Sequence, residues 1–166
     1  MSFIVIIPAR FSSSRLPGKP LIDIGGKPMI ERVYGLAKQS KAKEVYVATD
    51  HQEILDCCSS FGAKAVMTKP EHLTGTDRVA ETTEILNLNS ETVIVNLQGD
   101  EPFLNFSDID NLAKFFIKEK RFDIGTLFSN FTDKQNLNDP NLVKIWVDKE
   151  GEVKGFSRRK DFIESS

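Results

Sequence analysis

Cationic side chains gather directly after the first apolar segment of the chain, residues 3–8. The loop that follows offers three cations, serine hydroxyls and a glycine, which come from Arg10, Ser13, Arg15, Gly18 and Lys19. These groups are the parts of an anion site, because glycine lets the backbone approach a ligand closely. Ligands of open α/β sheets bind beyond the carboxyl ends of the strands, so the loop predicts a site for a nucleotide triphosphate. A solvated surface loop is the alternative that the residue types alone leave open.

This loop differs from the two common nucleotide-binding motifs. In the pattern G-x-x-x-x-G-K-[ST], Ser13 stands in place of the first glycine and Pro20 in place of the final Ser or Thr. No G-x-G-x-x-G follows an expected strand, so the dinucleotide fingerprint is missing as well. The sequence therefore predicts a nucleotide-binding loop of another kind.

Asp100 follows a second apolar segment, residues 92–97, after Gln98 and Gly99. This position predicts a carboxylate at the carboxyl edge of the sheet. Beside a cationic triphosphate loop, such a carboxylate is best explained as a ligand of Mg²⁺ that also touches phosphate oxygens. The competing interpretation is a simple turn cap, closed by Pro102.

Residues 72–81 form a glycine-containing turn that leads into an expected helix, with Thr76 or Asp77 as its N-cap. Backbone groups and threonine hydroxyls of such a turn can contact a base, and Arg78 can reach an anionic substrate. Ordinary helix capping with an exposed Arg78 is the alternative.

The elements that must position these residues alternate along the chain. Short apolar runs rich in β-branched residues predict buried strands at 3–8, 44–48, 63–67 and 92–97, with amphipathic helices between them. Ser107 is the expected N-cap of a further helix that turns Phe115 and Phe116 inward, and strands are expected at 123–130, 142–147 and 153–157. The order predicts one α/β domain over residues 1–166, with a three-layer, doubly wound, mostly parallel Rossmann-like sheet.

The composition limits the class of protein. The 166 residues are 40% hydrophobic and 28% charged with a net charge of −2, which is typical of one soluble domain and argues against bulk nucleic-acid binding. No run is long enough to span a membrane and no signal peptide is recognisable, so a cytoplasmic location is expected. Neither the adjacent Cys57 and Cys58 nor the distant His51 and His72 have the spacing of a zinc site. The cysteines are expected to be reduced thiols on a helix.

Taken together, these stretches resemble the 3-deoxy-manno-octulosonate cytidylyltransferases, or CMP-Kdo synthetases. The similar segments are residues 6–21, 45–51, 67–81, 93–102, 138–144 and 156–158. The resemblance implies an α/β nucleotidyltransferase that converts CTP and the sugar acid Kdo into CMP-Kdo and diphosphate for lipopolysaccharide biosynthesis.

The same resemblance implies roles for individual residues. The CTP phosphates would be bound by Arg10, Ser13, Arg15 and Lys19. Gly75 and Thr76 would lie near the nucleotide, and Asp100 would bind Mg²⁺. Kdo would face Arg78, Gln98 and Arg158. The residues predicted to act in catalysis are therefore Arg10, Lys19 and Asp100.

The chain ends at Ser166, whereas chains of the family continue. The resemblance implies that the further part carries a His-x-Gly-x-Tyr segment for Kdo, a second metal-binding aspartate and much of a homodimer interface. Three interpretations stay open: an active cytidylyltransferase, a truncated and impaired CTP-binding protein, and a cytidylyltransferase for another sugar acid such as a sialic acid.

Overall fold

The computed structural model describes residues 2–12, 16–119, 122–130 and 139–159. The residues fall into two compact units, Met1–Gly125 and Thr126–Ser166, and each is described by itself. A single domain over residues 1–166 stays a prediction. Among the described residues, no helix combines the length and apolar character that crossing a membrane requires.

The first unit is built on a parallel sheet with the strand order β3-β2-β1-β4. Its strands are β1 (Phe3–Ala9), β2 (Glu44–Thr49), β3 (Ala65–Met67) and β4 (Val93–Asn96). All seven residues of β1 are buried, because helices cover both faces of the central strand. This double burial explains why the strands appear in the sequence as continuous apolar runs, and the four predicted strands are confirmed.

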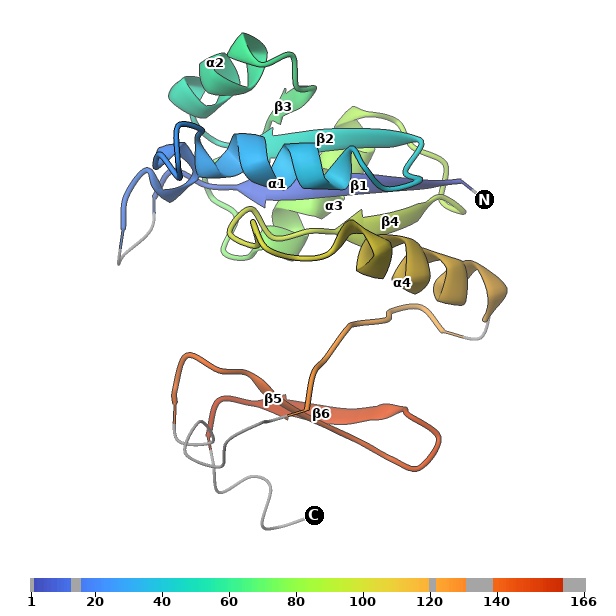
Figure 1. The fold of residues 1–166 in the computed structure, drawn as a ribbon. Coiled ribbons are helices and arrows are strands. Elements are labelled where there is room, and N and C mark those ends of the chain that lie inside the picture. The colour runs from blue at the N-terminus through green and yellow to red at the C-terminus, as the bar shows by residue number, and fades with distance from the viewer. Residues whose placement is uncertain (1, 13–15, 120–121, 131–138, 160–166) are drawn as a thin grey trace. The chain divides into compact units, whose positions relative to one another are not determined.

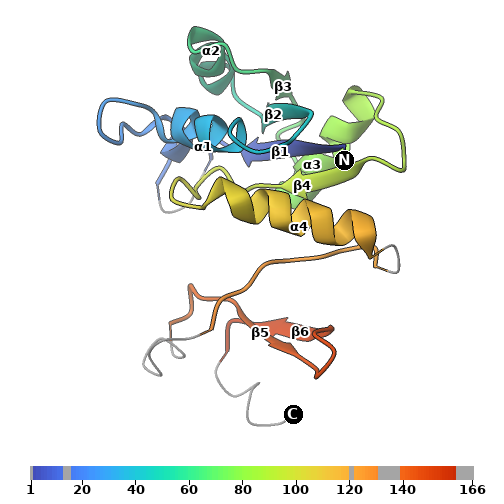
Figure 2. The same cartoon turned by 45° about the vertical axis from the view of Figure 1, so that its right-hand side comes forward.

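Helices cover the two faces of this sheet unequally (Figures 1 and 2). The larger core lies against α1 (Met29–Ala37), α2 (Gln52–Ser60) and α4 (Phe106–Lys118). The opposite face packs against α3 (Gly75–Ile85), through Val79. The predicted three-layer α/β fold is therefore confirmed.

The strand order places a topological switch point between β1 and β4. From β1 the chain moves outward through β2 to β3, and α3 then carries it back across the other face to β4. Crevices at the carboxyl ends of strands that flank such a point are the usual ligand sites of α/β sheets. Here those ends are formed by residues 8–10 and 97–100.

Three predictions about α4 and the segment that follows it are wrong. Residues 123–130 form no strand in the described part of the chain: Ile124 is 87% exposed, and the segment crosses the boundary between the two units without a strand to pair with. Asn105, rather than Ser107, caps α4, and its side chain accepts hydrogen bonds from the backbone N–H and the hydroxyl of Ser107. Phe115 is 53% exposed on α4 and does not face the core.

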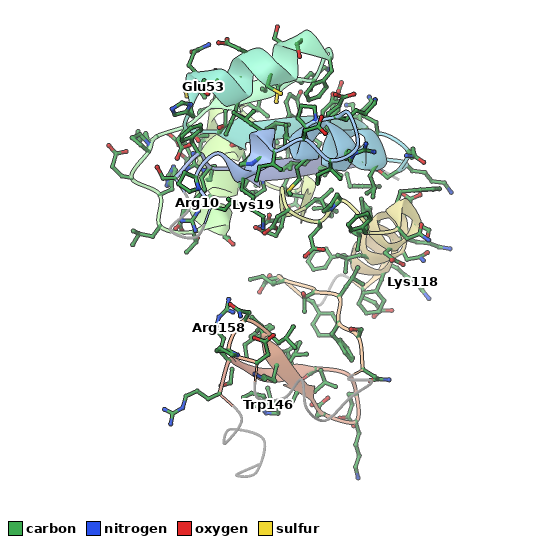
Figure 3. The ribbon with its side chains drawn as sticks, turned by 60° about the vertical axis from the view of Figure 1, so that its left-hand side comes forward. Arg10, Lys19, Glu53, Lys118, Trp146 and Arg158 are labelled. Carbon is green, nitrogen blue, oxygen red and sulfur yellow. The ribbon has the colours of Figure 1, made fainter. Side chains whose placement is uncertain are left out.

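The second unit contains an antiparallel hairpin of β5 (Lys144–Val147) and β6 (Val153–Ser157). These strands were expected, and β5 begins two residues later than predicted. The ring of Trp146 lies against Gly155 on the opposite strand and leaves no room for a Cβ there. Figure 3 labels Trp146 and Arg158 on this hairpin.

The cysteines of α2 give a prediction about thiol reactivity. Burial raises the pKa of the Cys58 thiol to about 12, against about 8.5 for a free thiol, and raises that of the half-buried Cys57 less. The thiolate is the reactive form, so at about pH 8 native Cys58 should react with iodoacetamide on the order of 10³-fold more slowly than in the urea-unfolded chain. Peptide mass spectrometry measures both rates, with Cys57 as the faster internal control. Equal labelling of the two native thiols would contradict this expectation.

Candidate functional site

Two neighbouring pockets lie at the switch point. The first, here called the loop pocket, has a volume of about 390 Å³ and is lined by Pro8, Ala9, Arg10, Leu16, Lys19, Pro20, Gln98, Gly99 and Asp100. The second, the helix pocket, has a volume of about 250 Å³ and is lined by Pro8, Arg10, His72, Leu73, Thr74, Gly75, Arg78 and Gln98. Pro8, Arg10 and Gln98 border both pockets, so the two form one composite site around the ends of β1 and β4.

Lys19 and Asp100 meet in the loop pocket. The Lys19 Nζ donates a hydrogen bond to Asp100 Oδ2 at 2.6 Å, across 81 residues of sequence. The lysine opens the short helix η1 (Lys19–Leu21), which begins after Gly18 in the left-handed conformation at φ 67°. Both side chains are partly exposed, at 37% and 48%, so the pair adds little to stability but places a cation and a carboxylate together in open space.

Arg10 is exposed at the end of β1 and borders both pockets. Figure 3 labels Arg10 and Lys19 at the same end of the first unit. The structure thus brings together Arg10, Lys19, Gln98 and Asp100, four of the predicted site residues. Ser13 and Arg15 lie outside the described residues.

The first turn of α3 forms a wall of the helix pocket. Gly75 packs tightly here, because a Cβ at this position would lie 3.2 Å from Pro8 Cγ and 3.3 Å from Gln98 Oε1. Thr76 is exposed and lines neither pocket. The predicted N-caps are wrong: Thr74 caps the helix, and Asp77 completes a capping box with it. Thr74 lies two residues before Thr76, and its hydroxyl oxygen accepts a hydrogen bond from the Asp77 backbone N–H. In return, the Asp77 carboxylate accepts the backbone N–H of Thr74.

This capping box gives a pH prediction. Hydrogen bonds from the Thr74 hydroxyl and backbone N–H hold the pKa of Asp77 below its usual value. A depressed pKa contributes stability that is present above the ordinary value of about 3.9 and is lost as the pH falls through the lower folded-state value. The melting temperature of the chain should therefore decrease as the pH is lowered below about 4. The melting temperature of the Asp77→Asn variant should decrease less over the same pH interval. Parallel thermal melts of both chains test this, and identical acid slopes would contradict it.

Arg78 lies in the helix pocket but is only 2% exposed. Its Nη2 donates to Asp50 Oδ2 at 2.8 Å, and its Nη1 donates to Thr68 Oγ1 and, at 3.4 Å, to the Lys69 carbonyl. The exposed Arg78 considered as an alternative is thus excluded. Its guanidinium donates three hydrogen bonds to other residues of the chain. A contact between Arg78 and the sugar acid stays a prediction.

Arg158 belongs to the second unit. Its Nη1 donates to the carbonyl oxygens of Pro140 and Asn141 at 3.2 and 2.9 Å. The buried Lys144 donates its Nζ to the carbonyls of Asp139 and Arg158, both at 2.8 Å. These contacts order the hairpin and the segment before it around Arg158.

Asp50 and Glu81 contact residues of the helix pocket, although the sequence analysis gave neither of them nor His72 a role in the site. His72 lines the helix pocket and its Nε2 lies 2.6 Å from Glu81 Oε2, which also accepts the Lys69 N–H at 2.8 Å. Asp50 directly follows β2, so the rule that selected Asp100 at a strand end would also have selected Asp50.

The residues present fit a magnesium ion that is shared with a phosphorylated ligand. Within the described ranges, no group of three or more His, Cys, Asp or Glu side chains could hold a metal ion alone. Mg²⁺ is commonly bound by one or two carboxylates together with substrate phosphates and waters. Asp100, half exposed in a pocket with Arg10 and Lys19, offers one such carboxylate.

Comparisons with known proteins identify the family of the chain. The cytidylyltransferase family model matches residues 4–165. Curated 3-deoxy-manno-octulosonate cytidylyltransferases from Hahella chejuensis and Haemophilus influenzae are 45% and 48% identical, over 95% of this chain and 62% of their own lengths. A solved structure of CMP:2-keto-3-deoxy-manno-octonic acid synthetase complexed with CTP is 37% identical, with a TM-score of 0.84 over 99% of this chain and 68% of that one. The chain spans less than two thirds of the length of these curated relatives, and it belongs to the cytidylyltransferase family, in the branch of the 3-deoxy-manno-octulosonate cytidylyltransferases.

Proposed function

We propose that the chain binds CTP in the composite site and transfers its CMP group to Kdo. The observation that carries this proposal is the contact of Lys19 with Asp100 beside Arg10, in a pocket at the switch point. Two cations and a carboxylate in one open pocket suit a triphosphate that arrives with a divalent metal. The similar solved structure is described as a complex with CTP, which supports the choice of nucleotide.

In the proposed reaction, the anomeric hydroxyl oxygen of Kdo attacks the α-phosphorus of CTP. A new bond joins that oxygen to phosphorus, the bond from phosphorus to the β-phosphate oxygen breaks, and diphosphate leaves while the hydroxyl proton passes to solvent. Arg10 and Lys19 would take up the negative charge that develops on the departing phosphates. Positioning and electrostatics supply the catalysis, and no covalent intermediate with the chain is required.

Asp100 would hold Mg²⁺ together with phosphate oxygens. The ion, when bound, supplies Lewis acidity at the α-phosphate. Lys19 lies at the same carboxylate and keeps a positive charge beside it, which limits repulsion between Asp100 and an entering triphosphate. The carboxylate and the two cations are therefore complementary parts of one electrostatic site.

Further assignments belong to the same proposal. Gly75 and Thr76 are assigned to the nucleotide side, with Ser13 and Arg15 at the phosphates. Kdo is assigned to Gln98, Arg78 and Arg158. The position of Gln98 on the border of both pockets supports its assignment, and its Nε2 donates to Asn96 Oδ1 at 2.9 Å. A homodimer and a cytoplasmic location stay predictions.

Diphosphate release by the chain tests the proposal. The complete reaction contains CTP, Mg²⁺ and Kdo, and separate reactions omit each component or replace Kdo with a sialic acid. Release that requires all three components and falls with sialic acid is the expected result. CTP binding by calorimetry without diphosphate release would instead favour the binding-only alternative, and release with sialic acid alone would favour the other sugar-acid activity.

A further inference from the structure

The side chain of Asp50 joins the two halves of the composite site. Its Oδ1 accepts the backbone N–H of Phe11 at 3.1 Å, and its Oδ2 accepts Arg78 Nη2 at 2.8 Å. The side chain of Asp50 is 10% exposed, so water does not readily replace either of these hydrogen bonds. One carboxylate thus connects the residue after Arg10 to the helix that walls the helix pocket.

Phe11 in turn holds both ends of the cationic loop. Its carbonyl accepts the N–H of Gly18 at 2.9 Å, directly before Lys19. Its ring stacks on His51 with centroids 3.8 Å apart, and it also lies close to Gly18, where a Cβ would be 3.5 Å from ring atom Cε2. Arg10 precedes Phe11 and Lys19 follows Gly18, so these contacts join the backbone directly beside the two cations.

Arg78 binds the second oxygen of the Asp50 carboxylate. A buried guanidinium needs a buried counter-charge, and among the described residues its ion-pair partner is Asp50. Its bonds to Thr68 and Lys69 attach the pair to the end of β3. One oxygen of Asp50 pairs with this guanidinium while the other accepts the Phe11 N–H.

We propose that Asp50 is a positioning residue for nucleotide binding: through Phe11 it holds Arg10 and Lys19 at the separation that the phosphates of CTP require. The inference rests on the proposed function for the identity of the nucleotide. It assigns no contact between Asp50 and the ligand. Its effect should appear in CTP affinity and in the protection of the Phe11 amide, because a preorganised site loses less freedom on binding.

The test compares Asp50→Ala with Thr68→Val. Thr68→Val removes the hydroxyl that accepts from Arg78 Nη1 but leaves Asp50 and Phe11 untouched, so it weakens the same buried network at a different point. Three quantities are measured for each chain: the Kd for CTP by calorimetry, hydrogen exchange of the Phe11 amide, and the melting temperature. A third chain carries phenyllactic acid in place of Phe11, which replaces only the N–H donor by an ester oxygen and keeps the Asp50 to Arg78 pair.

Asp50→Ala and the ester chain are expected to raise the Kd for CTP by about tenfold or more, and Asp50→Ala should speed exchange of the Phe11 amide. Thr68→Val should lower the melting temperature with Kd and exchange near the wild-type values. Wild-type affinity in the ester chain, or affinities that simply follow the melting temperatures of all variants, would overturn the inference. If Asp50→Ala does not fold, the ester chain decides.

The proposed function and the positioning role of Asp50 can be refuted independently. A wild-type chain that does not bind CTP would refute the proposed function, while Phe11 exchange would still show whether Asp50 holds the loop. Wild-type CTP binding with an unchanged Kd in the ester chain would refute only the role of Asp50.

Discussion

Asp100→Asn is expected to lower the rate of diphosphate release by roughly 10²- to 10³-fold. Asparagine keeps the size of the side chain and can still accept from Lys19 Nζ, but it loses the negative charge that a divalent cation needs. The fold should be little affected, because the carboxylate is 48% exposed and such ion pairs contribute about 0–1 kcal/mol. A large kinetic effect with a small change in stability would mark Asp100 as part of the reaction site.

The measurement is diphosphate release as a function of Mg²⁺ concentration, together with the melting temperature. Glu44→Gln is the matched control, since it neutralises one carboxylate of a partly exposed pair with Lys64 at 2.8 Å, on the strand β2. The control should turn over at the wild-type rate. Unchanged turnover in Asp100→Asn at limiting Mg²⁺ would remove the metal-binding role from this residue.

The sequence predicted the sheet well because burial leaves a direct trace in residue type. β1 is buried on both faces and appears as an unbroken apolar run, and Val93, Ile94 and Val95 of β4 contact the cores on both faces. Helix starts were less predictable, since Thr74, Thr76 and Asp77 are all good capping residues and only the folded backbone decides which one caps. Residues 123–130 include Ile124, Leu127 and Phe128, which suit a strand, but a strand also needs a partner, which no local pattern reveals.

In the candidate site, too, local signals were predictable from the sequence and long-range contacts were not. Lys19 and Asp100 were predicted because each follows a strand whose carboxyl end points to one edge of the sheet, and the structure brings them into contact. The partner of Arg78 was not predicted, since Asp50 lies 28 residues away and residue types alone do not distinguish an arginine that binds a substrate from one buried in an ion pair. Long-range polar pairs of this kind are fixed by the packing of α3 across the sheet.

Gly99→Ala is expected to impair both stability and turnover. A Cβ at position 99 would lie 2.9 Å from the backbone carbonyl oxygen of Pro8, closer than unbonded atoms tolerate, so the ends of β1 and β4 must move apart. Overpacking of this kind costs about 1–3 kcal/mol. Gln98 and Asp100 flank this glycine in the loop pocket, and a displacement of about 1 Å can lower turnover by about 10²-fold.

Gly35→Ala is the matched control for that substitution. Position 35 lies in α1 with nothing within 4 Å of an added Cβ, so alanine should stabilise the helix by up to about 1 kcal/mol and leave turnover unchanged. Both variants are assayed well below their melting temperatures, so that loss of folded chain does not enter the rate. Because Asp100 directly follows Gly99, Gly99→Ala should displace this carboxylate and need more Mg²⁺ for half-maximal release. Wild-type turnover and Mg²⁺ dependence in Gly99→Ala would show that the site tolerates separation of the two strand ends.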